Sequence, residues 1–147
     1  MSESYVEMEL REIQTSDDPR DHPIVVLEEK NGDRRFPIFI GPMEARALDE
    51  SVVGHGKGYE IIRRPMSHDL MLNIIDGLGA ELKRLLIPKL EAGTFYGLLE
   101  LSNAKGELVH IDTRPSDGLV VAMKRKVPIF VEEMVLKEVD ATDESED

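Results

Sequence analysis

Apolar and polar side chains alternate with a period of two in the amino-terminal part of the chain. Residues 6–10 alternate in this way, which is typical of a strand with one buried face. Asn31-Gly32 predicts a hairpin turn between strands at residues 24–27 and 35–40, because both turn residues tolerate positive φ. The first of these strands is continuously apolar and is expected to be buried on both faces. Pro37 cannot donate a ladder hydrogen bond, so the second strand is expected at a sheet edge or a bulge.

Three other segments carry apolar residues at helical spacing. They are residues 43–53, the segment that follows Ser67, and the segment that begins at Arg114-Pro115. Ser67 is the expected N-cap of the second helix, and Gly79 is expected to terminate it.

Three strands with short connections are expected between the second and third helices, at about residues 81–90, 94–101 and 107–113. A last, short strand is expected at residues 128–131. Strands in groups with helices interspersed favour an α+β fold, here a single domain with a mixed, mostly antiparallel sheet and about three helices. The edge proline and the short last strand suggest exposed sheet edges, and such edges favour a homo-oligomer.

The composition indicates an ordinary globular domain. The chain has 147 residues, of which 41% are hydrophobic and 33% charged, and it contains no cysteine. Disulfides and thiolate metal ligands are therefore excluded. No apolar run approaches the ~18–20 residues of a membrane helix, so no membrane partner is expected. The amino terminus lacks the pattern of a secretion signal, which makes a cytoplasmic location the default expectation.

The charge balance disfavours nucleic acid as a partner. The net charge is −12, whereas polyanions are usually bound by basic surfaces. Six of the excess negative charges lie in residues 138–147, which contain no base. This segment is expected to be an acidic, disordered tail that follows a domain spanning residues 1–137. The domain still carries a net charge of −6, which argues against strong, non-specific binding to duplexes.

The run from Arg64 to Asp69 places a cation, a hydroxyl, an imidazole and a carboxylate at one expected helix start. A helix amino terminus offers free N–H groups and positive potential, which suit a phosphate. Arg64 and Ser67 could therefore contact a substrate. His68 could act as acid, base or metal ligand, and Asp69 could orient it or bind a cation. The alternative is structural, with Ser67 capping the helix and Asp69 complementing its dipole.

The run from Asp112 to Asp117 repeats this chemistry at the start of the third helix. Asp112 is expected on the strand face that points away from the core. Asp112 and Asp117 flank Arg114, so they could hold a divalent metal or simply orient the arginine in a salt-bridged cap. Because the two runs are so similar, we predict that the helix starts at Ser67 and Ser116 share one surface region.

Other chemistry-bearing features are weaker. Glu44 lies in the first turn of its helix, where most glutamates merely complement the dipole. Residues 54–58 are glycine-rich but lack the Gly-Lys-Ser/Thr of a phosphate loop, so a flexible connector is expected. Aromatic residues make up only 5% of the chain, which leaves few candidates for stacking on bases.

Across these motifs the chain resembles the bifunctional nuclease family. In order, the matching segments are Phe36-Pro37-Ile38-Phe39-Ile40-Gly41 with Glu44-Ala45, Arg64-Pro65-Met66-Ser67-His68-Asp69-Leu70, Gly93-Thr94-Phe95-Tyr96, Ile111-Asp112-Thr113-Arg114-Pro115-Ser116-Asp117-Gly118-Leu119, and Pro128-Ile129-Phe130-Val131. They extend from about residue 5 to 137. The resemblance implies degradation of DNA and RNA, which is described for some members. Members often have Thr in place of Ser67 and Ala in place of Gly118, and neither difference removes a candidate catalytic group.

The motifs and the resemblance together favour a nuclease that hydrolyses phosphodiesters with a divalent cation, magnesium or manganese. The expected catalytic residues are His68, Asp69, Asp112 and Asp117. The three aspartates are also the expected metal ligands, with Glu44 as a further candidate. The expected substrate-binding residues are Arg64, Ser67, Arg114 and Ser116. The alternative function is a non-catalytic, homo-oligomeric module that binds a small anionic ligand or a protein partner, which the acidic balance favours.

Overall fold

The computed structural model describes residues 4–15, 17–18, 20–53 and 64–146. The strands are β1 (Tyr5–Gln14), β2 (Ile24–Glu29), β3 (Arg35–Phe39), β4 (Glu81–Glu91), β5 (Thr94–Ser102), β6 (Leu108–Thr113) and β7 (Ile129–Glu132). The helices are α1 (Pro42–Val53), α2 (Ser67–Gly77), α3 (Pro115–Arg125) and α4 (Glu133–Glu146). The predicted connector at residues 54–58 lies outside the described residues.

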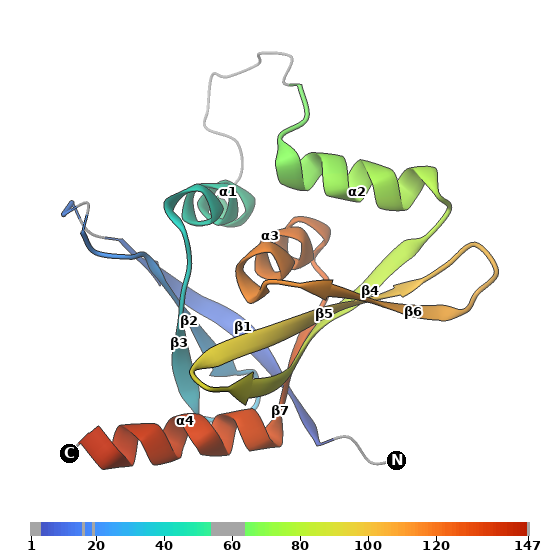
Figure 1. Cartoon of the computed structure of the whole chain (residues 1–147). Coiled ribbons are helices and arrows are strands. Elements are labelled where there is room, and N and C mark those ends of the chain that lie inside the picture. Colours follow the sequence, from blue (N-terminus) through green and yellow to red (C-terminus); the bar gives the residue numbers. More distant parts are fainter. Residues whose placement is uncertain (1–3, 16, 19, 54–63, 147) are drawn as a thin grey trace.

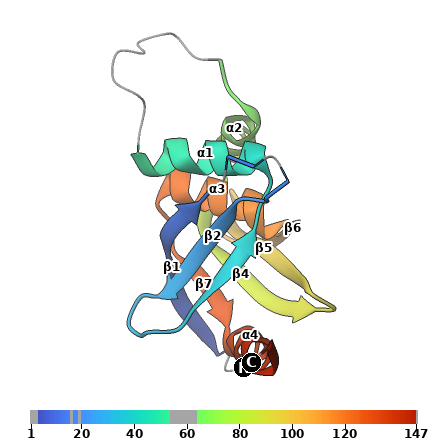
Figure 2. The same ribbon diagram turned by 90° about the vertical axis from the view of Figure 1, so that its left-hand side faces the viewer.

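One sheet of seven strands organises the described part of the chain, in the order β3-β2-β1-β7-β4-β5-β6. All neighbouring strands are antiparallel except β4 and β7, which are parallel. The helices α1, α2 and α3 lie together at one side of the sheet, and α4 lies at the other (Figures 1 and 2). The expected α+β class is confirmed, with four helices in the described residues instead of about three.

Two three-stranded meanders build most of the sheet. The first, β1-β2-β3, leads into α1, and the second, β4-β5-β6, leads into α3. Strand β7 joins them, because it pairs with β1 on one side and β4 on the other. The expectation that the short last strand forms a sheet edge is therefore wrong. The edges are β3 and β6, and the edge position of Pro37 in β3 is confirmed.

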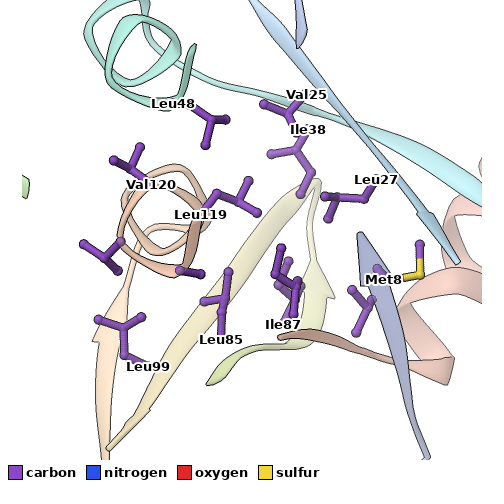
Figure 3. Packing of buried hydrophobic residues seen from close by; sticks show 14 of the residues in the cluster. Met8, Val25, Leu27, Ile38, Leu48, Leu85, Ile87, Leu99, Leu119 and Val120 are labelled. Carbon is purple, nitrogen blue, oxygen red and sulfur yellow. The ribbon is translucent and has the colours of Figure 1, made fainter. Parts of the chain in front are cut away.

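The core lies between the sheet and the helices α1 and α3 (Figure 3). Leu48 of α1 and Leu119 of α3 are fully buried against strand side chains such as Leu85 of β4. A Cβ at Gly118 would come within 2.6 Å of Leu85 Cδ1, so the glycine lets α3 approach β4 closely. An alanine at this position would require Leu85 to change its rotamer.

Strand β2 departs from the expectation that both of its faces are buried. Val25 and Leu27 are buried, but the alternate residues Ile24 and Val26 are only half-buried. Helix α4, at the other side of the sheet from α1, α2 and α3, packs mainly against β4 and β7. A continuously apolar strand thus has one core face and one partly exposed face.

Arg34, next to the β2–β3 turn, fastens this hairpin to the start of α4. Its guanidinium donates hydrogen bonds to the carboxylates of Glu29 and Glu133. These bonds raise the pKa of Arg34 and lower the pKa of both glutamates. Helix α4 continues through Glu146, so the described part of the segment expected to be an acidic tail is helical. The domain boundary at residue 137 stays a prediction.

None of the helices in the described ranges combines the length and the apolar character that a membrane crossing requires.

Candidate functional site

The first turns of α2 and α3 meet through a hydrogen bond between side chains. Nε2 of His68 lies 2.9 Å from Oδ1 of Asp117. His68 is buried, although it belongs to the first turn of α2, and Asp117 is half-buried in the first turn of α3. The prediction that these two helix starts share one region of the molecule is confirmed by this contact.

Asp69 caps the start of α2. The backbone N–H of Met66 donates to Oδ2 of Asp69 over 3.0 Å, which is half of a capping box. Ser67 is the first residue of the helix, so its expected position as the N-cap is wrong by one residue. This carboxylate accepts from the N–H of the N-cap residue, whereas a serine N-cap would accept from the N–H of the second or third helical residue. Beyond the other end of the helix, Gly79 has a φ of +72°, as a terminating glycine requires.

Two ion pairs hold α2 against α3. Nζ of Lys124 lies 3.1 Å from Oδ1 of Asp69, and the Arg125 guanidinium lies 2.7 Å from Oδ2 of Asp76. The Arg125 hydrogen bonds lower the pKa of Asp76 below its ordinary value. Both basic residues come from the last turn of α3 and both acids from α2. The orientation of α2, and with it the position of His68, is thereby fixed at points separate from the contact with Asp117.

Helix α1 brings Glu44 toward the same place. Pro42 begins α1 as Pro115 begins α3, and a proline is favoured at this position because its φ already suits a helix. Glu44 and Asp117 are then equivalent acidic residues, each two positions after the proline. Oε1 of Glu44 lies 3.9 Å from the guanidinium of Arg114, which lies directly before α3.

A cavity of about 520 Å³ opens among the first turns of α1, α2 and α3. We call it the histidine cavity. Its functional lining residues are Glu44, Arg46, Arg64, Ser67, His68, Asp117 and Lys124. Three cations and two carboxylates line it, although the whole chain carries a net charge of −12. Because Lys124 is also paired with Asp69, the cavity is close to neutral, which suits an anion better than the average charge of the chain does.

A second cavity of about 420 Å³ lies next to it, and we call it the aromatic cavity. Asp112, Arg114 and Ser116 line this second space together with Phe39 and Tyr96. The structure thus separates the predicted site residues into two groups. The residues of the first run, together with Glu44 and Asp117, belong to the histidine cavity, with Asp69 at its margin. The other residues of the second run belong to the aromatic cavity.

The three aspartates predicted as metal ligands do not form one group. Among the described residues, no three His, Asp or Glu side chains are arranged to hold a metal ion. Asp69 is paired with Lys124, Asp117 with His68, and Asp112 lines the aromatic cavity. Mg²⁺ is commonly held by one or two carboxylates together with water and substrate phosphates. Glu44 and Asp117 are the carboxylates that line the histidine cavity among the described residues.

Sequence reasoning missed two contributions to the site. Lys124 lies seven residues after Asp117, which places both on the same face of α3, so helical periodicity could have found it. Phe39 and Tyr96 come from β3 and β5, which are not neighbours in the sheet. No local pattern in the sequence connects these two aromatic residues.

The fold and the site define an α+β protein with a polar cavity at three converging helix starts. The family model described as the bifunctional nuclease domain matches residues 25–144. Two uncharacterised proteins from two strains of Mycobacterium tuberculosis are each 39% identical over 118 residues, which cover 80% of this chain and 66% of theirs. The Arabidopsis thaliana protein named Bifunctional nuclease 1 is 27% identical over 113 residues, which cover 75% of this chain and 33% of the plant protein. The chain belongs to the bifunctional nuclease domain family.

Proposed function

We propose that this protein is a nuclease that hydrolyses phosphodiester bonds of DNA or RNA in the histidine cavity. The observation that carries the proposal is the His68–Asp117 hydrogen bond in a cavity that three cations also line. An imidazole held by a carboxylate is a common arrangement for proton transfer, and the cations suit a phosphate. Membership of the bifunctional nuclease domain family supports the same chemistry.

The residues of the histidine cavity have different proposed roles. Arg64 and Lys124 bind the phosphate, together with the free N–H groups at the start of α2. His68 transfers a proton to or from the reacting oxygen. Asp117 orients the imidazole and stabilises its protonated form, as the carboxylate does in catalytic triads.

A divalent cation, magnesium or manganese, would be held by Asp117 and Glu44 together with the phosphate of the substrate, since these are the two carboxylates of the cavity. Such an ion, when bound, neutralises phosphate charge and activates water. Asp69 pairs with Lys124 and accepts a hydrogen bond from the backbone N–H before α2. Its proposed role is therefore to position the site, not to react with the substrate.

The test is a nuclease assay with purified protein, on single-stranded and duplex DNA and RNA, with EDTA, magnesium or manganese. His68→Gln should lower the rate by roughly 10²- to 10⁴-fold, the usual contribution of a general acid or base. His110→Gln is the matched control, because it removes a second histidine–carboxylate contact, of 3.3 Å to Glu100, outside the cavity. Hydrolysis that is equal in both variants and the wild type would place the activity elsewhere.

A second function, the homo-oligomeric binding module, is favoured by an exposed apolar ridge on α2. The ridge consists of residues spaced four apart and between 52% and 72% exposed, namely Met66, Leu70, Ile74 and Leu78. Exposed apolar patches of this kind mark interaction sites. If the protein does not hydrolyse nucleic acid, its histidine cavity would hold a small anion in such an assembly.

We propose that the occupant of the ridge is a second copy of this chain. The acidic residues of α2, Asp69 and Asp76, are neutralised by Lys124 and Arg125, so the ridge is not surrounded by unbalanced negative charge. Two copies can therefore approach here despite the net charge of −12. Met66 also lines the histidine cavity, so a docked copy would form part of its rim. The assembly and the candidate site are thus connected.

A further inference from the structure

The aromatic cavity brings together rings from distant parts of the sheet. Phe39 of edge strand β3 is 67% exposed and Tyr96 of β5 is 37% exposed, and both line the cavity. Four strands separate β3 from β5 in the sheet order. The sheet nevertheless curls enough for Phe36 of β3 to stack on Phe95 of β5, with ring centroids 5.4 Å apart. This contact holds the two walls of the cavity at a fixed separation.

The cavity also offers hydrogen-bonding groups of both kinds. Asp112 contributes a carboxylate acceptor, and Arg114, whose side chain is 72% exposed, contributes a guanidinium donor. The hydroxyl of Thr113 donates to the Arg114 carbonyl over 2.9 Å and fixes the backbone between them. Nζ of Lys89 lies 4.5 Å from the centroid of the Tyr96 ring and covers one face of it, so a ligand would use the other face.

The first turn of α3 lies between the aromatic cavity and the histidine cavity. Ser116 lines the aromatic cavity and the next residue, Asp117, lines the histidine cavity. Arg114 reaches across the boundary to Glu44 over 3.9 Å. The two cavities are therefore joined by the Arg114–Glu44 contact and by consecutive residues of α3.

We propose that the aromatic cavity binds a nucleobase of single-stranded nucleic acid, with the ring stacked on Phe39 or Tyr96 and its edge bonded to Asp112 and Arg114. Stacking is open to unpaired bases, because the faces of bases in a duplex are already covered. It also solves a difficulty of this chain. A protein with a net charge of −12 gains little from counterion release, whereas stacking does not depend on net charge.

The cavity volume of about 420 Å³ lies within the range of roughly 300–1,000 Å³ that is usual for small-ligand sites. The identity of the ligand rests on the proposed nuclease function. Base binding itself can be measured without hydrolysis, so the two proposals can fail separately.

The experiment compares a short single-stranded oligodeoxynucleotide with an abasic strand of equal length and charge, bound to the wild-type protein in EDTA. The strand with bases should bind about 5- to 100-fold more tightly, the range expected for stacking of a base on an aromatic ring. Phe39→Leu and Tyr96→Leu should each reduce this ratio. Tyr96→Phe is the matched control, because it keeps the ring and removes only the hydroxyl, and it should retain the ratio.

Equal affinity for the two strands would overturn the proposal, as would a ratio that Tyr96→Leu leaves unchanged. A change of oligomeric state in Phe39→Leu, with the base preference intact, would show that protein covers this cavity and would also overturn it. Thermal melting of each variant checks the fold, and the pair Tyr96→Leu and Tyr96→Phe decides the matter if Phe39→Leu does not fold. Base preference without hydrolysis in the magnesium assay would remove the nuclease function and leave the base site in place.

Discussion

His68 and Asp117 start two different helices, and their side chains are joined over 2.9 Å, yet this bond is one of several contacts between the helices. The pairs Asp69–Lys124 and Asp76–Arg125 connect α2 and α3 independently. The His68–Asp117 contact can therefore be altered while the fold is kept. Variants of His68 or Asp117 should therefore lose hydrolytic activity while their melting temperature changes little.

Asp117→Asn should lower the rate of phosphodiester hydrolysis by roughly 10²- to 10⁴-fold, because the neutral amide lacks the negative charge that stabilises a protonated imidazole or a bound cation. Its melting temperature should change little. Asp76→Asn is the matched control on α2, where loss of an exposed ion pair should also change the melting temperature little and leave the rate unchanged. The measurement is nuclease rate and thermal melting on the same preparations. A rate that follows stability in both variants would assign Asp117 a purely structural role.

The Asp112→Asn variant distinguishes two roles for Asp112, as a metal ligand and as a contact for the edge of the base. As a metal ligand it would be required for turnover, but the structure places it in the aromatic cavity. We therefore expect kcat to be kept and KM to rise several-fold, because only binding of the base edge is weakened. Steady-state kinetics at several magnesium concentrations check this. A loss of kcat that added magnesium restores would return Asp112 to the metal site.

Arg114→Ala should weaken binding of single-stranded nucleic acid, and the effect should shrink as salt rises. A slope of log K against log salt that falls by about one would show that the guanidinium contacts a phosphate, whereas an unchanged slope fits its proposed contact with the base edge. Its pair with Glu44 is long and exposed, so stability should change by less than about 1 kcal/mol. Titrations at a series of salt concentrations, with melting curves, test both statements. A large loss of stability would identify Arg114 as a structural anchor.

The buried carboxylate of Glu100 makes the fold sensitive to acid. The hydrogen bond from Arg84 lowers the pKa of Glu100 below its ordinary value. The pair therefore stabilises the folded state above the unfolded pKa, and this contribution is lost as pH falls through the lower, folded pKa.

Arg84→Met should consequently cost about 2 kcal/mol near neutral pH, because the buried Glu100 carboxylate then loses its guanidinium partner. The cost should shrink as pH falls through the lowered, folded pKa of Glu100, below which the carboxyl is protonated in both states. Urea unfolding of the wild type and the variant at several pH values measures this. Arg11→Met breaks the more exposed pair with Glu28 and should cost less than about 1 kcal/mol. A cost for Arg84→Met that does not depend on pH would contradict the role assigned to Glu100.

Ile74→Glu should convert the proposed homo-oligomer into a monomer, since it places a charge in the middle of the α2 ridge. Met134→Glu is the control, because Met134 is an apolar residue of α4 that is 67% exposed and lies away from the ridge. Sedimentation of the wild type and both variants at micromolar concentration decides the question. A monomeric wild type would refute the assembly.

The elements of this fold were predictable because each has a local signature. The period of two in residues 6–10, the Asn31-Gly32 turn and the helical spacing after Ser67 all involve neighbours in the sequence. The arrangement of the elements was not predictable in this way. Val6 pairs with Val131 across nearly the whole chain, and nothing near either residue indicates that pairing. The central position of β7 was missed for this reason.

In the candidate site, too, some features could be predicted from the sequence and others could not. The likeness of the two Arg-Pro runs correctly indicated that the starts of α2 and α3 meet. It also suggested that Asp112 and Asp117 act together, although the two lie in different cavities. Asp112 ends a strand and Asp117 lies in a helix, so the turn at Arg114-Pro115 directs them apart. A run of residues gives the chemistry available, whereas the direction of each side chain depends on the backbone between them.

Strand β7 is the last strand to be synthesised, yet it occupies the middle of the sheet. Both meanders are therefore synthesised before the strand that connects them. Until β7 is in place, β1 and β4 each present an unpaired edge, and such edges can join to the wrong partner. The sheet should consequently close in one late step, when β7 pairs with both β1 and β4.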